Sequence, residues 1–318
     1  SSDVCSSDLL CITDPGVGFY IQWIILSLMG LSTWLVLQSG RISLGQQAYF
    51  GVGAYAAASV TVMLQGSLFQ ALLVAGLCGA IFSAIVSRLL QPLSGLQYAL
   101  ATLATAELVR LGLSAWTWRM PHPQGFEVGP DGIHGFREIR WLYENQMGSQ
   151  VFLILSAGLL LAAIALILKI SQTKLGLSIQ SIGFDIELAK NHGESVHLLQ
   201  TLTQTFAGAI GALAGALYAH QATFIEPAVF DVMLGIHAVG YAMLGGLATP
   251  LGPLLGAAFD LGLLEATRIF EGWRMVIFGG LVAIFLRWRP GGLLNHNTLY
   301  RIKQFLERRK IHEHSKFA

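Results

Sequence analysis

Long apolar stretches, separated by short polar segments, run through almost the whole chain. About 20 consecutive apolar residues are needed for a helix to cross the hydrocarbon core of a bilayer. The pattern predicts nine such spans, over residues 19–38, 46–64, 68–87, 95–116, 150–170, 199–221, 230–247, 251–270 and 275–289. The predicted fold class is therefore all-α, a polytopic transmembrane helical bundle.

Composition agrees with this pattern. Of the 318 residues 54% are hydrophobic and 12% are charged, and the mean hydropathy is +0.61. A soluble domain carries about a quarter of its residues as Asp, Glu, Lys or Arg, so a soluble enzyme, a disordered chain and a nucleic-acid binder are disfavoured. A net charge of +1 indicates no polyanionic partner. Cys5, Cys11 and Cys78 show no metal or disulfide spacing.

The distribution of Lys and Arg predicts the orientation. With the C-terminus inside, alternation through nine spans places thirteen of the nineteen Lys and Arg residues in inner segments and four in outer loops. Inner loops of membrane proteins carry this excess of positive charge. The C-terminus is therefore expected to be cytoplasmic.

The two ends of the chain are set apart from the spans. Residues 1–9 are SSDVCSSDL, the string that the codons AGT TCA GAC GTG TGC TCT TCC GAT CTN would encode, and these codons spell the end of a DNA sequencing adapter. We expect these residues to be an assembly artefact rather than a natural polar N-terminus, with one further helix lost before residue 10. Residues 10–294 form the expected transmembrane domain, and 295–318 a basic cytoplasmic tail whose amphipathic helix would lie on the anionic inner leaflet.

Familiar enzymatic motifs are missing from the sequence. It has no G-x-x-x-x-G-K-[ST] phosphate loop and no H-E-x-x-H zinc motif. An intramembrane protease would need a facing serine and histidine, and nothing singles out Ser32 and His237 for that role. We therefore expect no enzyme, no metal site and no cofactor.

A polar, glycine-rich turn leads into the second predicted span, with the sequence GRISLGQQAYFGVGAY over residues 40–55. Gln46 and Gln47 stand at the entrance of the span, where polar side chains are unfavourable unless they pair or line a water-filled path. Tight helix packing is the other role open to these glycines.

Two charged pairs interrupt the spans. Glu107 and Arg110 lie in the outer part of one span, and Glu265 and Arg268 in the outer part of another. The i, i+3 spacing puts both charges on one helix face, where they can pair. Their recurrence suggests an internal duplication, although a structural salt bridge would leave the same pattern. Asp260 is expected either to face a cavity or to be neutral.

The inner loop 171–198 contains the segment ELAKNHG, residues 187–193. It predicts a short amphipathic helix, ended by Gly193, that could dock a soluble partner. A simple connector is the alternative.

Six blocks together resemble the LivM-type permease subunit of branched-chain amino-acid ABC importers. They are residues 40–55, LATLATAELVR at 100–110, GPDGI at 129–133, AGAIGALAGALYA at 207–219, MLGGL at 243–247 with GP at 252–253, and RPGGLL at 289–294. The match runs in the expected order from about residue 19 to residue 294. Glu187, Ala189 and Gly193 are similar to the E-A-A-x-x-x-G loop by which such permeases engage their ATPase. The segment departs at Leu188, lacks the later I-x-L-P part, and has Gln180 and Ser181 where arginines are usual.

The resemblance implies a subunit of the bacterial inner membrane that works by alternating access. Its partners would be membrane lipid, a homologous second permease, two cytoplasmic ATP-binding subunits and an extracytoplasmic solute-binding protein. Ser43, Gly45 and Gln46 would line the translocation path, and Glu107 with Arg110 would hold the outer gate or its supporting packing. A sister importer for urea, short amides or another small polar solute stays open, as does a stand-alone secondary transporter or channel.

Overall fold

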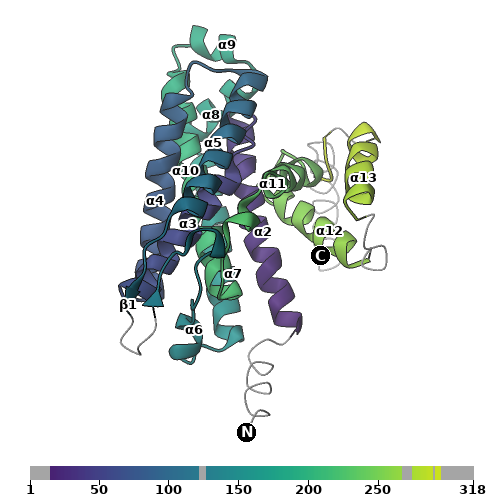
Figure 1. The fold of residues 1–318 in the computed structure, drawn as a ribbon. Coiled ribbons are helices and arrows are strands. Elements are labelled where there is room, and N and C mark those ends of the chain that lie inside the picture. Colours follow the sequence, from purple (N-terminus) through teal and green to yellow (C-terminus); the bar gives the residue numbers. More distant parts are fainter. Residues whose placement is uncertain (1–14, 122–126, 267–273, 289–290, 295–318) are drawn as a thin grey trace, which may run out of the picture.

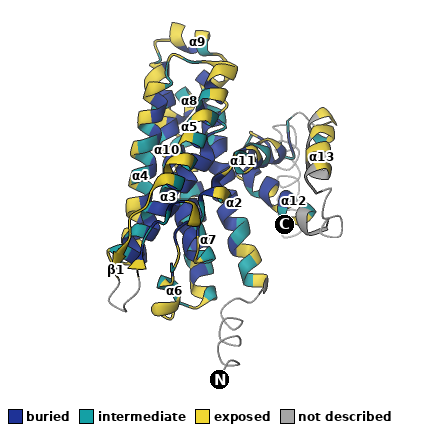
Figure 2. Ribbon diagram, viewed as in Figure 1, coloured by how far each residue is buried: buried dark blue, intermediate teal, exposed yellow. Residues whose placement is uncertain are grey.

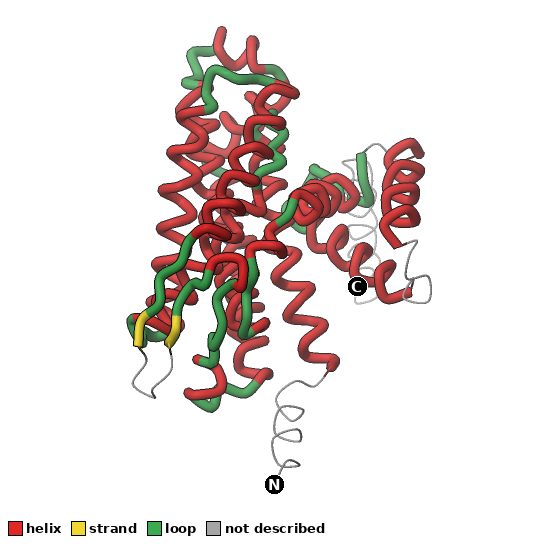
Figure 3. Tube along the Cα trace, in the orientation of Figure 1, coloured by secondary structure: helices red, strands yellow, loops and turns green. Residues whose placement is uncertain are grey.

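The computed structural model describes residues 15–121, 127–266, 274–288 and 291–294, and helices dominate it (Figures 1 and 3). The predicted class of helical membrane protein is confirmed. The helices are α2 (Pro15–Gln38), α3 (Gln46–Ala58), α4 (Leu68–Leu89), α5 (Gly95–Ala115), α6 (Trp141–Glu144), α7 (Ser149–Ser171), α8 (Lys174–Phe184), α9 (Ile186–Asn191), α10 (Val196–Ala222), α11 (Val232–Gly245), α12 (Gly252–Ala266) and α13 (Arg274–Trp288).

Each of the nine predicted spans overlaps a helix, and among the described residues only positions at the ends of the spans are not helical. In the described part of the chain, four helices are both long and apolar enough to cross a membrane, namely α2, α4, α7 and α10, while α11 and α12 are shorter apolar helices. The span predicted over 46–64 is α3 followed by a π-helical turn, η1 (Ser59–Met63). The number of membrane crossings stays a prediction.

Helix α10 is the centre of the main bundle and packs against α2, α3 and α4. Its small residues make this possible, because backbones approach closely only where side chains are short. Gly208 faces Gly79 of α4, and Gly215 faces the backbone of α3 at Phe50. Helices α11 and α12 pack on each other and on α2, beside the main bundle (Figure 1).

The outward faces of the bundle are apolar, as a lipid-facing surface requires. On α4 the exposed side chains Phe69, Leu73 and Leu77 recur every four residues, and so form one helical stripe. The inward side of the same helix is buried at Ala71, Leu72 and Ala75 (Figure 2). The pattern is that of a helix between lipid and protein.

The two long loops lie at opposite ends of the molecule (Figure 1). One end carries α9. The other carries α6 and a short antiparallel hairpin of β1 (Met120–Pro121) and β2 (Glu127–Val128). Two further 3-10 turns, η2 (Gly132–His134) and η3 (Pro227–Phe230), belong to this end, where Phe136 and Ile225 exchange backbone hydrogen bonds of 2.7 and 3.0 Å. Neither the hairpin nor α6 and α8 was predicted from the sequence.

Candidate functional site

The polar turn between α2 and α3 is partly buried inside the bundle. Ser43 and Gln46 have no exposed surface, and Gly45 precedes the first residue of α3. A Cβ at Gly45 would lie 2.7 Å from the backbone oxygen of Thr102 in α5. The Thr102 hydroxyl in turn accepts a hydrogen bond of 3.1 Å from the Leu44 amide. Glycine is therefore required here by the close approach of α5.

Gln46 reaches inward to α2 and α10. The Ser32 hydroxyl lies 2.8 Å from Gln46 Oε1 and 2.7 Å from the carbonyl oxygen of Ala207. Both atoms are acceptors, so the single hydroxyl proton serves one of them at a time. Gln46 Nε2 and Gln47 Oε1 are buried with no hydrogen-bond partner among the described residues. Buried polar atoms in native proteins are nearly always paired, so these two atoms are exceptions within the bundle.

A second series of polar contacts lies beside Gln46, and the sequence analysis did not predict it. Gln204 of α10 donates a hydrogen bond of 2.9 Å to the Tyr49 hydroxyl, and the Tyr98 hydroxyl lies 3.5 Å from Gln204 Oε1. The Arg41 guanidinium stands 4.5 Å above the Tyr98 ring, a cation–π contact. The available signal was Gln204 itself, an amide within an otherwise apolar predicted span.

The structure brings Glu107 and Arg110 together on α5. Arg110 Nε lies 3.0 Å from both carboxylate oxygens of Glu107, and a guanidinium NH2 also donates to Oε1. The two side chains are 37% and 27% exposed. Such a forked pair satisfies both charges at once. Arg268 lies outside the described residues, and the side chain of Glu265 is likewise not described, so the second pair stays a prediction.

Asp260 of α12 is fully buried and pairs with His237 of α11, Nδ1 to Oδ2, at 3.2 Å. Its other oxygen, Oδ1, has no hydrogen-bond partner among the residues the structure describes. Ser32 and His237 thus take different partners, and no serine–histidine pair is formed between them.

The short helix predicted in the inner loop is α9. Asp185 caps it, because its Oδ1 accepts hydrogen bonds from the amides of Glu187 and Leu188 at 2.9 and 3.0 Å. Ala189 is 2% exposed and packs with Ile182, Val196 and Leu199. Glu187 and Lys190 form an ion pair of 2.8 Å on the outer face of the helix.

Gly193 ends this segment with φ of +81°. Its amide donates to the Lys190 carbonyl oxygen at 2.9 Å. Nothing lies within 4 Å of the position that a Cβ would occupy. Glycine is thus required by the backbone conformation alone.

The turn before α3 also touches α8, the helix that leads to α9. Gly40 has φ of +74°, and a Cβ there would lie 3.3 Å from Gly183 Cα. A Cβ at Gly183 would overlap the carbonyl oxygen of Gln38. From α10, Gln200 also donates a hydrogen bond of 3.4 Å to the Ser39 carbonyl oxygen of the turn. The polar turn and the α8–α9 segment are therefore in direct backbone contact.

At the opposite end, Arg119 bonds to Asp131 and lies 3.5 Å from Glu127. Both partners of the Arg119–Asp131 pair are outside the membrane-spanning helices. The hydrogen bond from Arg119 holds the pKa of the Asp131 carboxyl below its usual range. Asp131 is consequently ionised at neutral pH and ties the two sides of this loop together.

Across the part of the chain that the structure describes, no group of three His, Cys, Asp or Glu side chains could hold a metal ion.

Comparisons with known proteins agree on one family. Residues 17–286 match the family described as branched-chain amino acid transport system, permease component. The chain is 27% identical to the high-affinity branched-chain amino acid transport system permease protein LivM of Escherichia coli K12, over 86% of this chain and 67% of LivM. No solved structure gives a significant match.

Two other relatives differ in the solute that they are named for. The chain is 28% identical to the branched-chain amino acid permease BraD of Pseudomonas aeruginosa over 45% of this chain and 47% of BraD. It is 26% identical to the galactofuranose transporter permease YtfT of Escherichia coli K12, over 74% of this chain and 63% of YtfT.

Proposed function

The chain belongs to the family of permease components of branched-chain amino acid transport systems, and we propose that it moves leucine, isoleucine and valine inward as the membrane-spanning subunit of an ATP-driven importer. The match over residues 17–286, together with the similarity to LivM, carries this proposal.

The importer contains more than this chain. We infer a homologous second permease, two ATP-binding subunits on the cytoplasmic side and an extracytoplasmic solute-binding protein. The sequence has no phosphate loop of its own, so ATP hydrolysis has to be supplied by another chain. The location is the bacterial inner membrane, with α9 on the cytoplasmic side.

The contacts described above supply a route for coupling. The exposed residues of α9, Glu187, Leu188 and Lys190, would dock on the ATPase, while Ala189 anchors the helix to α8 and α10. Closure of the ATPase dimer would move α8, and the contact between Gly183 and Gly40 would carry that motion to the polar turn. The proposed result is alternating access at Ser43, Gly45 and Gln46.

The unpartnered amide of Gln46 supports the path assignment. A donor left without a partner in a membrane interior is unfavourable by a few kcal/mol. Water or a passing amino acid would satisfy it once the helices part. Glu107 and Arg110, at the other end of α5, would hold the outer gate closed.

The test is uptake of labelled leucine by vesicles that contain the gene's full product with its partner permease, ATPases and binding protein. Uptake that needs both internal ATP and the binding protein is expected. Uptake by this chain alone, without ATP, would overturn the proposal in favour of a secondary transporter.

A second candidate is an importer of another small polar solute, such as urea, a short amide or a sugar. The similarity to the galactofuranose permease YtfT favours it. ATP-dependent uptake of one of these solutes, without uptake of leucine, would support an ATP-driven importer but change the assigned substrate.

A further inference from the structure

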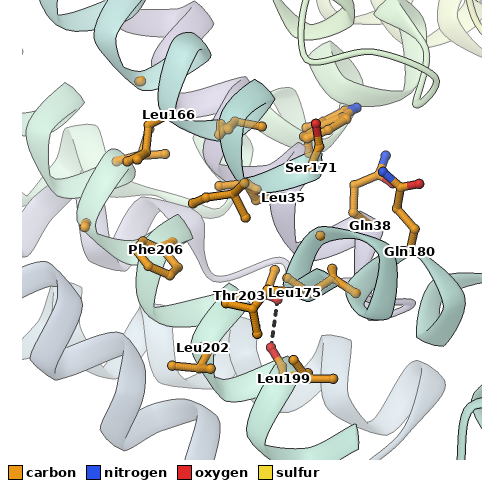
Figure 4. A pocket seen from close by; sticks show the side chains of 18 of the residues that line it. Leu35, Gln38, Leu166, Ser171, Leu175, Gln180, Leu199, Leu202, Thr203 and Phe206 are labelled. Carbon is orange, nitrogen blue, oxygen red and sulfur yellow. Dashed lines mark hydrogen bonds between the residues drawn. The ribbon is translucent and has the colours of Figure 1, made fainter. Parts of the chain in front are cut away.

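An apolar groove of about 390 Å³ lies between α2, α7, α8 and α10 (Figure 4). Helix α7 takes its main contacts from α2 and α8, so the space between α7 and α10 stays open. Alanines on both walls, Ala163 and Ala209, widen it. None of the predicted path residues lines this groove, which is therefore separate from the proposed translocation path.

Away from one polar end, the groove wall is hydrocarbon. Its polar side chains are turned to the protein: the Thr203 hydroxyl donates to the Leu199 carbonyl oxygen at 2.8 Å, and the Trp34 indole donates to that of Leu247 at 3.2 Å. No charged side chain lines it. An amino acid, with its ammonium and carboxylate, would find no partners here, whereas an acyl chain needs none.

The groove is open to the side on which lipid lies. Leu166 of α7, Leu175 of α8 and Phe206 of α10 line it, and their side chains are 47%, 55% and 45% exposed. Large exposed apolar side chains at membrane depth are suited to contact with lipid acyl chains.

One end of the groove is polar and positively charged. Gln38, Gln180 and Ser171 gather there (Figure 4). Lys169 and Lys174 stand directly beside the lining residues of the α7–α8 turn, and both are exposed. They are the only charged residues between positions 150 and 184. The end thus presents two cations at the depth where lipid headgroups lie. The carboxylate of Glu194, which accepts a hydrogen bond of 2.6 Å from Ser178, lies one turn further along α8.

We propose that the groove binds one acyl chain of an anionic phospholipid, with the phosphate held near Lys174. The chain lies along Leu166, Ile170 and Phe206. The headgroup sits against the first turn of α8, whose free amides add to the attraction for phosphate. The lipid therefore packs directly against the helix that leads into α9.

The test is the phospholipid that copurifies with the assembled complex, measured by mass spectrometry after extraction in mild detergent. Ala163→Phe and Ala209→Phe fill the groove from its two walls. If one variant fails to fold, the other still tests the site. Lys174→Glu removes the charge. Ala165→Phe is the matched control, because Ala165 is exposed on α7 but does not line the groove.

We expect the filling variants and Lys174→Glu to lose retained anionic lipid by about tenfold, equivalent to 1.4 kcal/mol, and Ala165→Phe to keep it. Equal retention in the filling variants and in Ala165→Phe would overturn the site. Retention of neutral phospholipid alone, unaffected by Lys174→Glu, would overturn the proposed headgroup.

Discussion

Gly53 of α3 and Gly215 of α10 each lie directly against the backbone of the other helix. A Cβ at Gly53 would overlap the backbone of Ala212, and a Cβ at Gly215 would overlap the carbonyl oxygen of Phe50. Backbone cannot move aside as a flexible side chain can. The whole contact between the two helices therefore depends on the absence of two methyl groups.

Gly215→Ala should lower the free energy of unfolding of the bundle by about 1–3 kcal/mol, the range measured when a methyl group overpacks a core. The measurement is the thermal unfolding midpoint of the detergent-solubilised complex. Gly158→Ala on α7 is the matched control, because nothing lies within 4 Å of its added methyl group. Equal midpoints for the two variants would show that the helices can separate without loss.

Glu107→Ala should reduce uptake about threefold to tenfold, because it leaves the Arg110 guanidinium unpaired within a membrane helix. The double variant Glu107→Ala, Arg110→Ala removes both charges and should recover part of the activity. Initial rates of ATP-driven uptake, normalised to protein in the membrane, measure both. Glu144→Ala, at the end of α6, is the control. Equal uptake rates for Glu144→Ala and Glu107→Ala would show that the Glu107–Arg110 ion pair is dispensable.

Gly193→Val should abolish uptake while the protein stays in the membrane. The residue has φ of +81° with open space around it, so the penalty of about 1–3 kcal/mol comes from the backbone and falls on the end of α9. Gly193→Asn should retain most activity, because asparagine tolerates this conformation. Binding of purified ATPase subunits should follow uptake. Normal uptake by the valine variant would contradict the coupling role of α9.

Acid should loosen the loop that Arg119 and Asp131 hold together. The pKa of Asp131 is lowered in the folded protein from its ordinary value of 3.8. The pair therefore contributes its stabilisation fully above that value and loses it as pH falls through the lower, folded pKa. Hydrogen exchange across residues 116–136, corrected for the intrinsic effect of pH, should stay constant from pH 8 to pH 5 and rise in more acidic solution.

Asp131→Asn provides the comparison for this acid effect. It should show at pH 7 the faster exchange that the unsubstituted loop shows only in acid. A rise in exchange with the same pH profile in both proteins would assign the acid effect to another group.

The long apolar runs were enough to predict the long helices, though not α6 and α8. A helix satisfies its own backbone hydrogen bonds, so in a bilayer the length of an apolar run determines the element without knowledge of its neighbours. The same local logic applies to α9, which Asp185 caps and Gly193 ends, and to the i, i+3 pair of Glu107 and Arg110.

The tertiary structure alone decided which distant residues meet. Ser32 and Gln46 are brought together with Ala207, and Tyr49 with Gln204, by the packing of α10 against α2 and α3. No spacing along the chain encodes such contacts, because they depend on which helix faces approach. The groove beside α7 and the contact of Gly40 with Gly183 arise in the same way. The sequence by itself determined the long helices and the family resemblance. Only the packing of helices, through close approach at glycines, determined the polar cluster around Gln46 and the apolar groove beside α7.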